Sequence, residues 1–417
     1  MYKVAIIGLG YVGLPLACLC AKKGHKVIGL DIDKNKIDKI NIGVSPLDDE
    51  YIKKNLKKGA IVATDDFSKI KAAEIIVICV PTPVNKEHLP DLSFVEKSVE
   101  SVSKNLEKGQ LVVLESTVYP GTTEEIIKPI LEKSGKAFYL AHCPERIDPG
   151  NKKWTIENIP RVVGGTNHES TEKAAEFYRT IISADIIEVK SSKEAEATKI
   201  MENTFRDVNI AFINEMAKSF DRAGIDIIDV IKGASSKPFA FMPHYPGVGV
   251  GGHCISVDPH YLIAKARGYG FEHEFLKLAR KINDSMPEYT VELLEKELKK
   301  SGKDLAGAKV GVLGLAYKGN IDDIRESPAV EVIKILKEKK ANVVVYDPHI
   351  PIKSDAKTLS ELVDKSDYLI LVTAHDEFRN MDLEKLKGKI KIIIDGRNCL
   401  DKNKVIALGI KYKGIGR

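Results

Sequence analysis

The chain has 417 residues, of which 43% are hydrophobic and 29% charged, and this composition is typical of a globular protein with two or three domains. Its net charge of +5 is spread over 64 basic and 59 acidic residues without a basic block, so nucleic acid is not an expected partner. No apolar run approaches the ~18 residues that span a bilayer and no signal-peptide pattern precedes the first strand, so we expect a cytoplasmic protein without membrane insertion.

Short apolar runs alternate with helical patterns in the first part of the chain. The runs are KVAIIGLG, KVIGLD, IIVICV, LVVLES and RVVGG. An apolar helical pattern follows the first run as far as Lys23, and the alternation predicts a parallel, doubly wound α/β sheet. We place this first domain at residues 1–190.

A long helical segment starts near Ser191. Ser191 and Glu194 have the spacing of a capping box, which predicts the first turn of a helix. The apolar residues that follow with a 3.6-residue period are 197, 200, 201, 204, 208, 211 and 212. Strand-like runs return at KVGVLGLAYKG, NVVVYD, YLILV and IKIIIDGRN. The predicted fold class is therefore α/β, with two Rossmann-like lobes, 1–190 and 301–417, joined by a central helical region, 191–300, that contains one long helix.

Gly8, Gly10 and Gly13 form the pattern G-x-G-x-x-G between a strand pattern and a helix pattern. Such glycines allow a tight turn and a close approach of the backbone to a pyrophosphate at a helix N-terminus. The next strand ends in Asp31, which has the spacing of an acid that binds both hydroxyls of a ribose, and this favours NAD over NADP. The alternatives are FAD and a turn with a purely structural role.

A second copy of the strand, turn and helix unit is predicted at residues 309–319, KVGVLGLAYKG, which align without a gap on residues 3–13, KVAIIGLGYVG. Ala316 replaces the middle glycine and would crowd a dinucleotide, whereas Lys318 adds a positive charge beside a helix N-terminus. We therefore expect this lobe to bind a different anion. The alternative is a decayed copy whose lysine is merely solvated.

Three polar residues, Lys199, Asn203 and Arg206, lie on one stripe of the long predicted helix, because they are spaced at i, i+4 and i+7. A lysine shielded from water beside an amide and an arginine is suited to acid–base chemistry. A solvated helix face is the alternative interpretation of the same stripe.

Cys254 ends a glycine-rich run, PGVGVGGHC. Its glycines, which allow unusual backbone conformations and the close approach of a ligand, are 247, 249, 251 and 252. His253 and Asp258 flank the thiol, and Lys199 with the loop amides could supply the electropositive setting of a nucleophilic cysteine. The alternatives are an inert buried cysteine and a zinc site with His253 and His260. We expect no metal, because adjacent residues rarely bind one ion in tetrahedral sites.

Several motifs in order resemble one family of enzymes over nearly the whole chain. They are GLGYVGLPLA, VPTP, ESTVYPGTT, CPERIDPGN, EATKIMENTFRDVNIAFINE, PGVGVGGHCISVDP, GLAYKGNIDDIRESPA and YDP. The family is that of the UDP-sugar 6-dehydrogenases, which includes UDP-glucose dehydrogenase and the UDP-N-acetylhexosamine dehydrogenases. The resemblance implies that the first lobe binds NAD, that the third domain holds the UDP moiety, and that the long helix forms the core of a homodimer.

The resemblance also implies a reaction, two successive hydride transfers from C6 of the sugar that end in a uronic acid. Lys199, or a water that it orients, would take the proton of the C6 hydroxyl. Cys254 would capture the aldehyde as a thiohemiacetal, whose oxyanion Lys199 and Asn203 would stabilise, and the second transfer would give a thioester. The residues that would place the hydrolytic water are Thr117, Glu145 and Asp258.

The resemblance implies a full set of site residues, some of which the motifs above already predict. The implied NAD contacts are Gly8, Gly10, Tyr11, Val12, Gly13, Asp31, Lys36, Thr82, Thr117 and Arg325. The implied substrate contacts are Glu145, Arg146, Lys199, Asn203, Arg206, Gly251 and Lys318, with Lys318 at the UDP phosphates. Two motifs, PERIDPGN and KPFAFMPHYPGVGVGGHC, favour UDP-N-acetylglucosamine as the substrate, with UDP-N-acetylmannosamine and then UDP-glucose as alternatives. The competing functions are a sugar-nucleotide epimerase and an NAD-binding module without catalysis.

Overall fold

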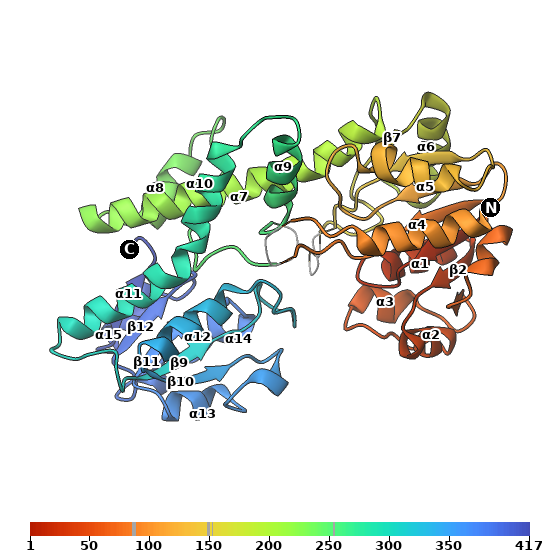
Figure 1. Cartoon of the computed structure of the whole chain (residues 1–417). Helices are drawn as coiled ribbons and strands as arrows, with labels where there is room; N and C mark the ends of the chain where they lie inside the picture. Colours follow the sequence, from red (N-terminus) through yellow and green to blue (C-terminus); the bar gives the residue numbers. More distant parts are fainter. Residues whose placement is uncertain (86–88, 148–150, 152, 253–254) are drawn as a thin grey trace. The chain divides into compact units, whose positions relative to one another are not determined.

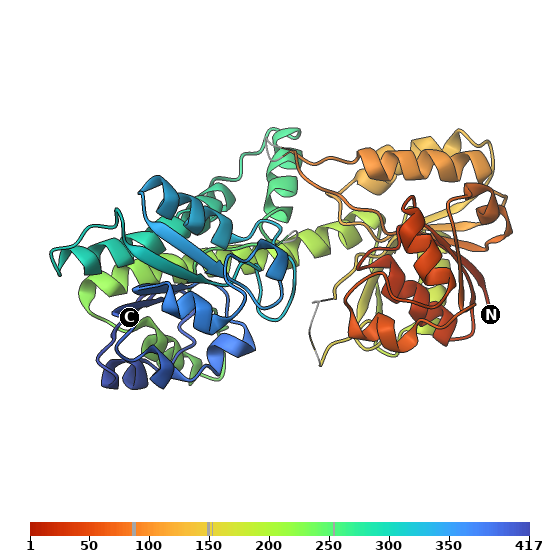
Figure 2. The same cartoon turned by 90° about the horizontal axis from the view of Figure 1, so that it is seen from below.

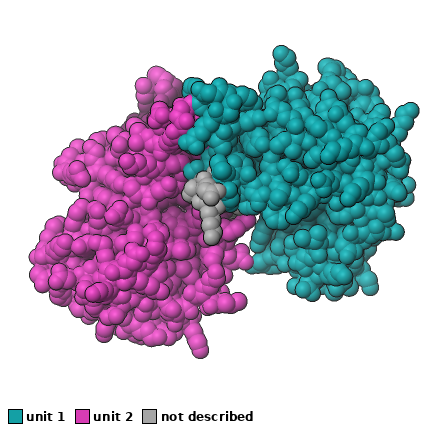
Figure 3. All heavy atoms as spheres, in the orientation of Figure 1, with its two compact units in different colours: residues 1–202, 260–271 teal, residues 203–259, 272–417 magenta. Residues whose placement is uncertain are grey.

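A computed structural model describes residues 1–85, 89–147, 151, 153–252 and 255–417. The chain forms two compact units, which Figure 3 shows in different colours. The units comprise residues 1–202 with 260–271, and residues 203–259 with 272–417. Each unit contains one main sheet, and one long helix begins in the first unit and ends in the second. The predicted fold class, two α/β lobes and a helical region with one long helix, is confirmed.

The sheet of the first unit has eight strands in the order β3-β2-β1-β4-β5-β6-β7-β8. The strands are β1 (Lys3–Ile7), β2 (Lys26–Leu30), β3 (Ile61–Thr64), β4 (Ile75–Ile78), β5 (Leu111–Leu114), β6 (Tyr139–His142), β7 (Arg161–Gly165) and β8 (Ile186–Glu188). The expectation of an all-parallel sheet is wrong at one place, because β6 and β7 are antiparallel. In the described part of the connection between them no helix carries the chain back across the sheet.

Helices cover both faces of this sheet. They are α1 (Gly13–Lys22), α2 (Lys34–Asn41), α3 (Glu50–Asn55), η1 (Phe67–Ala72), α4 (Ser93–Asn105), η2 (Thr123–Ile127), α5 (Lys128–Glu132) and α6 (His168–Ile181). Alternate residues of β1 face opposite sides, since Val4 and Ile6 join the apolar core of α1 and α6, while Ala5 and Ile7 join that of α4. Burial on both faces explains why the strands are continuous apolar runs.

The long predicted helix is α7 (Ser192–Ala223), which has 32 residues. Figures 1 and 2 show it as one continuous helix. The helix starts where the capping-box spacing predicts, although the contacts differ from a capping box, because the Ser191 hydroxyl bonds the Glu194 carboxylate and accepts the backbone N–H of Lys193. The predicted apolar face is partly wrong, since Met201 is 68% exposed and Phe212 54% exposed. The buried side of α7 instead carries several polar residues: Glu196, Lys199, Asn203, Asp207 and Asn214.

A short helix, α9 (Asp258–Arg267), belongs mostly to the first unit although it follows the glycine-rich run in sequence. The hydroxyl of Tyr261, which is fully buried, donates to the carbonyl of Thr82 after β4. Lys265 forms an ion pair with Glu125 of η2 at 2.6 Å. These contacts hold α9 against the carboxyl-terminal edge of the first sheet.

The second unit contains a five-stranded sheet in the order β10-β9-β11-β12-β13, in which every pair is parallel. Its strands are β9 (Lys309–Leu313), β10 (Asn342–Tyr346), β11 (Tyr368–Leu371), β12 (Ile392–Asp395) and β13 (Lys411–Gly414). Its helices are α8 (Ile227–Ser235), α10 (Glu274–Asp284), α11 (Met286–Lys299), α12 (Pro328–Glu338), η3 (Pro351–Lys353), α13 (Leu359–Asp364), α14 (Asp376–Arg379), η4 (Leu383–Leu386) and α15 (Lys402–Ala407).

The internal repeat is present in the structure, with one difference. β1 lies between β2 and β4 as β9 lies between β10 and β11. In the first copy α1 starts directly after the turn at Gly13, whereas in the second copy α12 starts only at Pro328. Left-handed backbone at Asn320 (φ 62°) and Glu326 (φ 51°) interrupts the helix expected there.

In the part of the chain that the structure describes, no helix has the length and apolar character needed to cross a membrane. Four cysteines, Cys18, Cys20, Cys79 and Cys143, are buried free thiols in the first unit, and Cys399 is half-buried. Burial raises the pKa of Cys18 to about 12, so this thiol remains protonated at neutral pH. Cys254 and His253 lie outside the described residues.

Candidate active site

The first glycine turn has the geometry of a dinucleotide-binding site. Gly8 has φ +91°, and a Cβ at this residue would lie 2.8 Å from the carbonyl oxygen of Cys79. A Cβ at Gly13 would lie 2.0 Å from the carbonyl oxygen of Gly8, whereas Gly10 has open space around the same position. Because no side chain caps the N-terminus of α1, its first amide groups can receive a phosphate.

Asp31, the predicted ribose acid, lies at the carboxyl end of β2 and is fixed beside this turn. Its Oδ2 accepts the backbone N–H of Leu9 at 2.9 Å, and its Oδ1 accepts that of Asp33 at 3.0 Å. Lys36, another predicted NAD contact, places its Nζ 3.6 Å from Oδ2 of Asp31. The carboxylate and the lysine predicted from the sequence are thus neighbours at the edge where parallel sheets bind dinucleotides.

The other predicted NAD contacts of the first unit lie along the same edge. Tyr11 is exposed and Val12 half-buried on the glycine turn. Thr82 follows β4 and is buried, and Thr117 follows β5 and is half-buried. Arg325 belongs to the second unit, where its exposed guanidinium is bonded to Asp323 at 2.6 Å.

Two predicted substrate contacts, Glu145 and Arg146, follow β6. Glu145 is buried, and its carboxylate accepts the backbone N–H groups of Arg146 and Ile147 at 2.6 and 2.8 Å. Arg146 is half-buried, and its guanidinium pairs with Glu202 of α7 at 2.6 Å and donates to the carbonyl of Pro160 at 2.9 Å. Arg146 therefore already has a carboxylate partner within the first unit.

The predicted polar stripe of α7 divides into a buried and an exposed part. Lys199 is 9% exposed, and among the described residues its amine has no hydrogen bond and no ion pair. Asn203, one turn further, is buried, and its amide donates to the Asp258 carboxylate at 2.5 Å. Arg206 is exposed. The structure thus brings together Asn203 and Asp258, which the sequence proposed for one site from distant positions.

The glycine-rich run packs tightly against the segment that follows the second turn. A Cβ at Gly251 would lie 2.5 Å from the carbonyl oxygen of Glu326, and a Cβ at Gly252 would lie 2.7 Å from the ring of Tyr317. The N–H of Gly252 donates to the carbonyl of Arg325 at 3.1 Å. Only glycine permits this contact between the run and the segment that carries Lys318.

A pocket of about 490 Å³ opens beside the second glycine turn. Its positively charged lining residues are Lys318, Arg379 and Arg397, and Asp376 also lines it. Arg379 donates to the carbonyl of Ala374 and Arg397 to that of Val372, at 3.2 and 2.7 Å. The carbonyl groups after β11 therefore orient both guanidinium groups beside Lys318, an arrangement suited to phosphate.

Arg379 and Arg397 were not predicted from the sequence. A signal for Arg397 was present, because it directly follows the apolar run of β12, at the edge of a parallel sheet where ligands bind. The only sign of Arg379 was its place in the short α14, which follows β11. Neither position forms a local motif, so only the fold brings them to Lys318.

The second lobe also uses its strand-end acid differently. Asp347 follows β10 as Asp31 follows β2, but it is fully buried. Its Oδ2 accepts the N–H groups of Leu315 and Ala316 at 2.6 and 2.9 Å and lies 3.0 Å from Nε2 of His375. Burial alone would raise the pKa of Asp347, but these hydrogen bonds outweigh it and lower the pKa to about 2. The carboxylate stabilises the turn instead of facing a ribose.

Three sequence profiles of one family match the chain in order, under the description UDP-glucose/GDP-mannose dehydrogenase family. The NAD binding domain matches residues 2–182, the central domain residues 193–285 and the UDP binding domain residues 311–402. The chain belongs to this family. The nucleotide-sugar dehydrogenase predicted from the motifs is thereby confirmed, as are the NAD cofactor and the UDP-sugar class of substrate.

Relatives of this dehydrogenase cover its whole length. It is 37% identical to the UDP-N-acetyl-D-mannosamine dehydrogenase of Pyrococcus horikoshii, over 100% of this chain and 99% of the relative. It is 38% identical to the UDP-N-acetyl-D-glucosamine 6-dehydrogenase of Pseudomonas aeruginosa, over 96% of this chain and 98% of the relative. A solved structure of the UDP-D-ManNAc dehydrogenase from P. horikoshii matches with a TM-score of 0.92 at 36% identity, over 100% of this chain and 99% of that chain.

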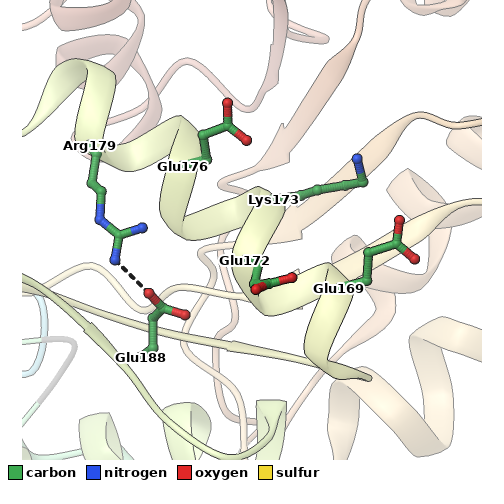
Figure 4. Close-up of a pocket in the computed structure, with 6 residues that line it drawn as sticks. All are labelled: Glu169, Glu172, Lys173, Glu176, Arg179 and Glu188. Atoms are coloured by element: carbon green, nitrogen blue, oxygen red, sulfur yellow. Dashed lines mark hydrogen bonds and ion pairs between the residues drawn. The ribbon is translucent and has the colours of Figure 1, made fainter.

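A second surface pocket of this dehydrogenase lies away from the sheet edge that binds nucleotides. It is lined by residues of α6 together with Glu188 of β8, as Figure 4 shows. Arg179 pairs with Glu188 at 2.5 Å, and Lys173 lies over the ring of Tyr139 at 4.5 Å. In Figure 4 Arg179 and Glu188 point toward one another, while the side chains of the other four lining residues point in different directions, so the six do not converge on a ligand. Among the described residues, no group of three or more His, Cys, Asp or Glu could hold a metal ion.

Proposed function

We propose that this dehydrogenase oxidises C6 of a UDP-N-acetylhexosamine to the uronic acid, with UDP-N-acetylglucosamine as the first candidate. The motifs PERIDPGN and KPFAFMPHYPGVGVGGHC support this substrate, and the P. aeruginosa relative carries its name. UDP-N-acetylmannosamine is the second candidate, because six relatives at 37–39% identity are named for it. UDP-glucose ranks behind both.

One observation carries the proposed chemistry, the unpaired amine of Lys199 on the buried side of α7. Lys199 is 9% exposed, and the described residues supply its amine with no hydrogen bond and no ion pair. Asn203 lies one turn away, bonded to Asp258. A lysine next to an oriented amide suits two roles, since its neutral amine can accept a proton and its ammonium form can stabilise an oxyanion.

The proposed first step converts the C6 alcohol into an aldehyde. NAD, when bound, supplies the hydride acceptor. Lys199, or a water that it orients, takes the proton of the C6 hydroxyl. The turn of Gly8, Gly10 and Gly13 binds the pyrophosphate of the cofactor, while Asp31 orients its ribose.

The later steps use the thiol of Cys254. The thiolate adds to the aldehyde carbon, and the oxyanion of the resulting thiohemiacetal is stabilised by Lys199 and Asn203. Loss of a second hydride gives a thioester, which a water placed by Glu145, Thr117 or Asp258 hydrolyses. Overall, one UDP-sugar, two NAD⁺ and one water give the uronate, two NADH and three protons.

The UDP moiety is proposed to bind in the pocket beside the second turn. Lys318, Arg379 and Arg397 together carry three positive charges at its wall, which matches a diphosphate. Ala316, whose side chain is buried in the core, leaves no place for the close approach of a dinucleotide at this turn. Arg206 is proposed to contact the sugar or a phosphate.

An NADH assay tests the substrate. The enzyme is supplied with NAD⁺ and each of UDP-N-acetylglucosamine, UDP-N-acetylmannosamine, UDP-N-acetylgalactosamine and UDP-glucose. We expect the highest kcat/KM with one of the first two and about two NADH per uronate, as the covalent mechanism requires. A ratio near one, or interconversion of sugars without release of NADH, would contradict the proposal.

A cysteine variant tests the covalent step. Cys254→Ser is expected to abolish the formation of uronate while NAD and UDP-sugar still bind, because the hydroxyl is far less nucleophilic than the thiolate. Binding is measured by calorimetry and uronate by mass spectrometry. Unchanged turnover of this variant would exclude the thiol mechanism.

We further propose a homodimer that works in the cytoplasm. Met201, Phe205 and Phe212 form an exposed apolar stripe along α7, with spacings of four and seven residues. His244 packs edge-on against Phe205 at 6.0 Å, and beside it in sequence Met242 and Tyr245 are also exposed. An exposed apolar stripe of this kind is typical of a protein interface, and a second copy of the chain would cover it.

A further inference from the structure

The antiparallel pair β6 and β7 places two charged residues opposite one another. Ala141 pairs with Gly165 and His142 with Gly164, so paired residue numbers add up to 306. Continued three residues beyond the end of β6, the same register sets Glu145 opposite Arg161, the first residue of β7. The two side chains do meet, since Nη2 of Arg161 donates to Oε2 of Glu145 at 2.7 Å.

The carboxylate of Glu145 is held by three donors in all. Oε1 accepts the N–H groups of Arg146 and Ile147, and Oε2 accepts the Arg161 guanidinium. These bonds fix both rotation and position of the group, and they leave a lone pair of Oε2 free. A carboxylate held in this way can orient a water but cannot swing toward one, so its placement depends on its donors.

Arg161 itself is fully buried, and its hydrogen bonding is directed at Glu145. Within the described residues its Nε and Nη1 have no hydrogen-bond partner, and its side chain donates one hydrogen bond, to Glu145. Burial alone would lower the pKa of Arg161, but Glu145 and Glu115 raise it, so the guanidinium remains charged. Such incomplete bonding is expensive for a group that serves only stability.

A second carboxylate flanks the other side of the guanidinium. Oε2 of Glu115 lies 3.9 Å from Nη1 of Arg161, and Oε1 of Glu115 accepts the hydroxyl of Tyr178 at 2.5 Å. The Sγ atom of Cys79 lies 3.9 Å from Oε2 of Glu115. The backbone carbonyl of Cys79 lies against Gly8. The cluster thus connects the glycine turn with the loop of Glu145.

The charge balance of the cluster favours a one-to-one pair. Burial raises the pKa of Glu115 to about 7, although Arg161 opposes the shift and Glu145 adds to it. The other titratable groups against the cluster, Cys20, Cys79, Cys143 and Tyr178, are buried and have raised pKa values, so they are neutral. With Glu115 partly protonated, the positive charge of Arg161 is directed mainly to Glu145.

We propose that Arg161 is a positioning residue, which holds the Glu145 carboxylate where it orients the water for hydrolysis of the thioester, while Glu115 and Tyr178 anchor the guanidinium. This inference rests on the proposed function, in which Glu145 helps to place that water. It assigns to the buried cluster a role in the last chemical step and none in the two hydride transfers.

The test separates hydrolysis from oxidation by stopped-flow measurement of NADH, with NAD⁺ and the UDP-sugar of highest turnover at saturation. The main variant is the double substitution Arg161→Met with Glu115→Gln, which removes one charge of each sign and leaves no orphaned carboxylate at residue 115. We expect a burst of about two NADH per active site, followed by a steady-state rate roughly 10- to 100-fold below that of the wild type. Glu115→Gln alone keeps the bond between Arg161 and Glu145 and is expected to lower the rate less.

Two further variants complete the design. Arg179→Met, at an exposed side chain of α6, is the matched arginine control and should leave both burst and steady state unchanged. Glu145→Gln should give the same burst and slow turnover as the double variant. Suppose that Glu145→Gln stalls after the burst, as proposed. The role of Arg161 would then be overturned by a normal steady-state rate of the double variant, or by a burst amplitude of that variant that falls in parallel with its rate. If Glu145→Gln turns over normally, the proposed role of Glu145 fails, and the inference fails with it.

Discussion

At the scale of single residues, Lys199 is the group whose surroundings are least explained by a role in stability. The Lys199 amine has no partner in the described residues, so its replacement breaks no hydrogen bond or ion pair there. Lys199→Ala is expected to lower kcat at least ~100-fold, the contribution of a general base, with little change in Tm. Lys193→Ala, on the exposed side of the same helix, should keep full activity. A near-normal kcat of Lys199→Ala would identify the lysine as a bystander.

Asp347 is a second residue whose effect can be predicted, here on stability. Its pKa of about 2 lies below the ordinary value of 3.8, so the folded state binds fewer protons than the unfolded state. The stabilisation is therefore complete above pH 4 and is lost as the pH falls toward 2, and its size is about 2 kcal/mol. Asp347→Asn should lower the free energy of unfolding in urea by about this amount at pH 7. The difference between wild type and variant should shrink at pH 2.5, and a difference independent of pH would contradict the assignment.

The residues that could be predicted from the sequence share one property, which is that each belongs to a local sequence motif. Gly8, Gly10 and Asp31 stand in a fixed spacing around one strand and one helix, and the structure places them together. Arg161 and Glu145 are 16 residues apart in sequence and meet through an antiparallel register that no local pattern reveals. Their pairing required the fold.

At the scale of elements, the glycine-rich run makes the strongest steric demand. Gly251→Ala would place a Cβ 2.5 Å from a backbone oxygen of Glu326, so the run must move away from the segment of Lys318. We expect a loss of about 1–3 kcal/mol in the free energy of unfolding, together with reduced turnover. Gly233→Ala in α8, where the added Cβ meets nothing within 4 Å, should instead be neutral or stabilise by about 0.5–1 kcal/mol. Equal effects of the two substitutions would show that packing at Gly251 is not tight.

Helix α7 shows where prediction of an element succeeds and where it fails. The capping residues and the 3.6-residue period predicted its start and its helical class, because both depend on neighbours along the chain. The buried face of α7 was partly misassigned, because its apolar residues were expected to form that face. Buried polar groups here are stabilised by specific partners, such as Glu196, whose carboxylate accepts the N–H groups of Gly121 and Thr123. Apolar Met201 and Phe212 are left on the exposed side.

At the scale of the whole molecule, the repeated strand and turn let the sequence predict two lobes of the same class. The antiparallel pair β6 and β7 was not predicted, because strand direction depends on the path of a connection without regular structure in its described part. The same holds for α12, which starts at Pro328 and not directly after the turn. The domain bounds near residues 190 and 300 stay predictions.

The exposed stripe of α7 gives a prediction for the assembled protein. If a second copy covers Met201, Phe205 and Phe212, a carboxylate introduced there would be buried without a partner, at a cost of several kcal/mol. Phe212→Glu should therefore convert the dimer to monomers in sedimentation equilibrium, while circular dichroism stays unchanged. Ile352→Glu, at the 96% exposed side chain in η3, serves as the control for an added negative charge and should remain dimeric. A dimer that persists in Phe212→Glu would place the interface on another face, and a monomeric wild type would exclude the homodimer altogether.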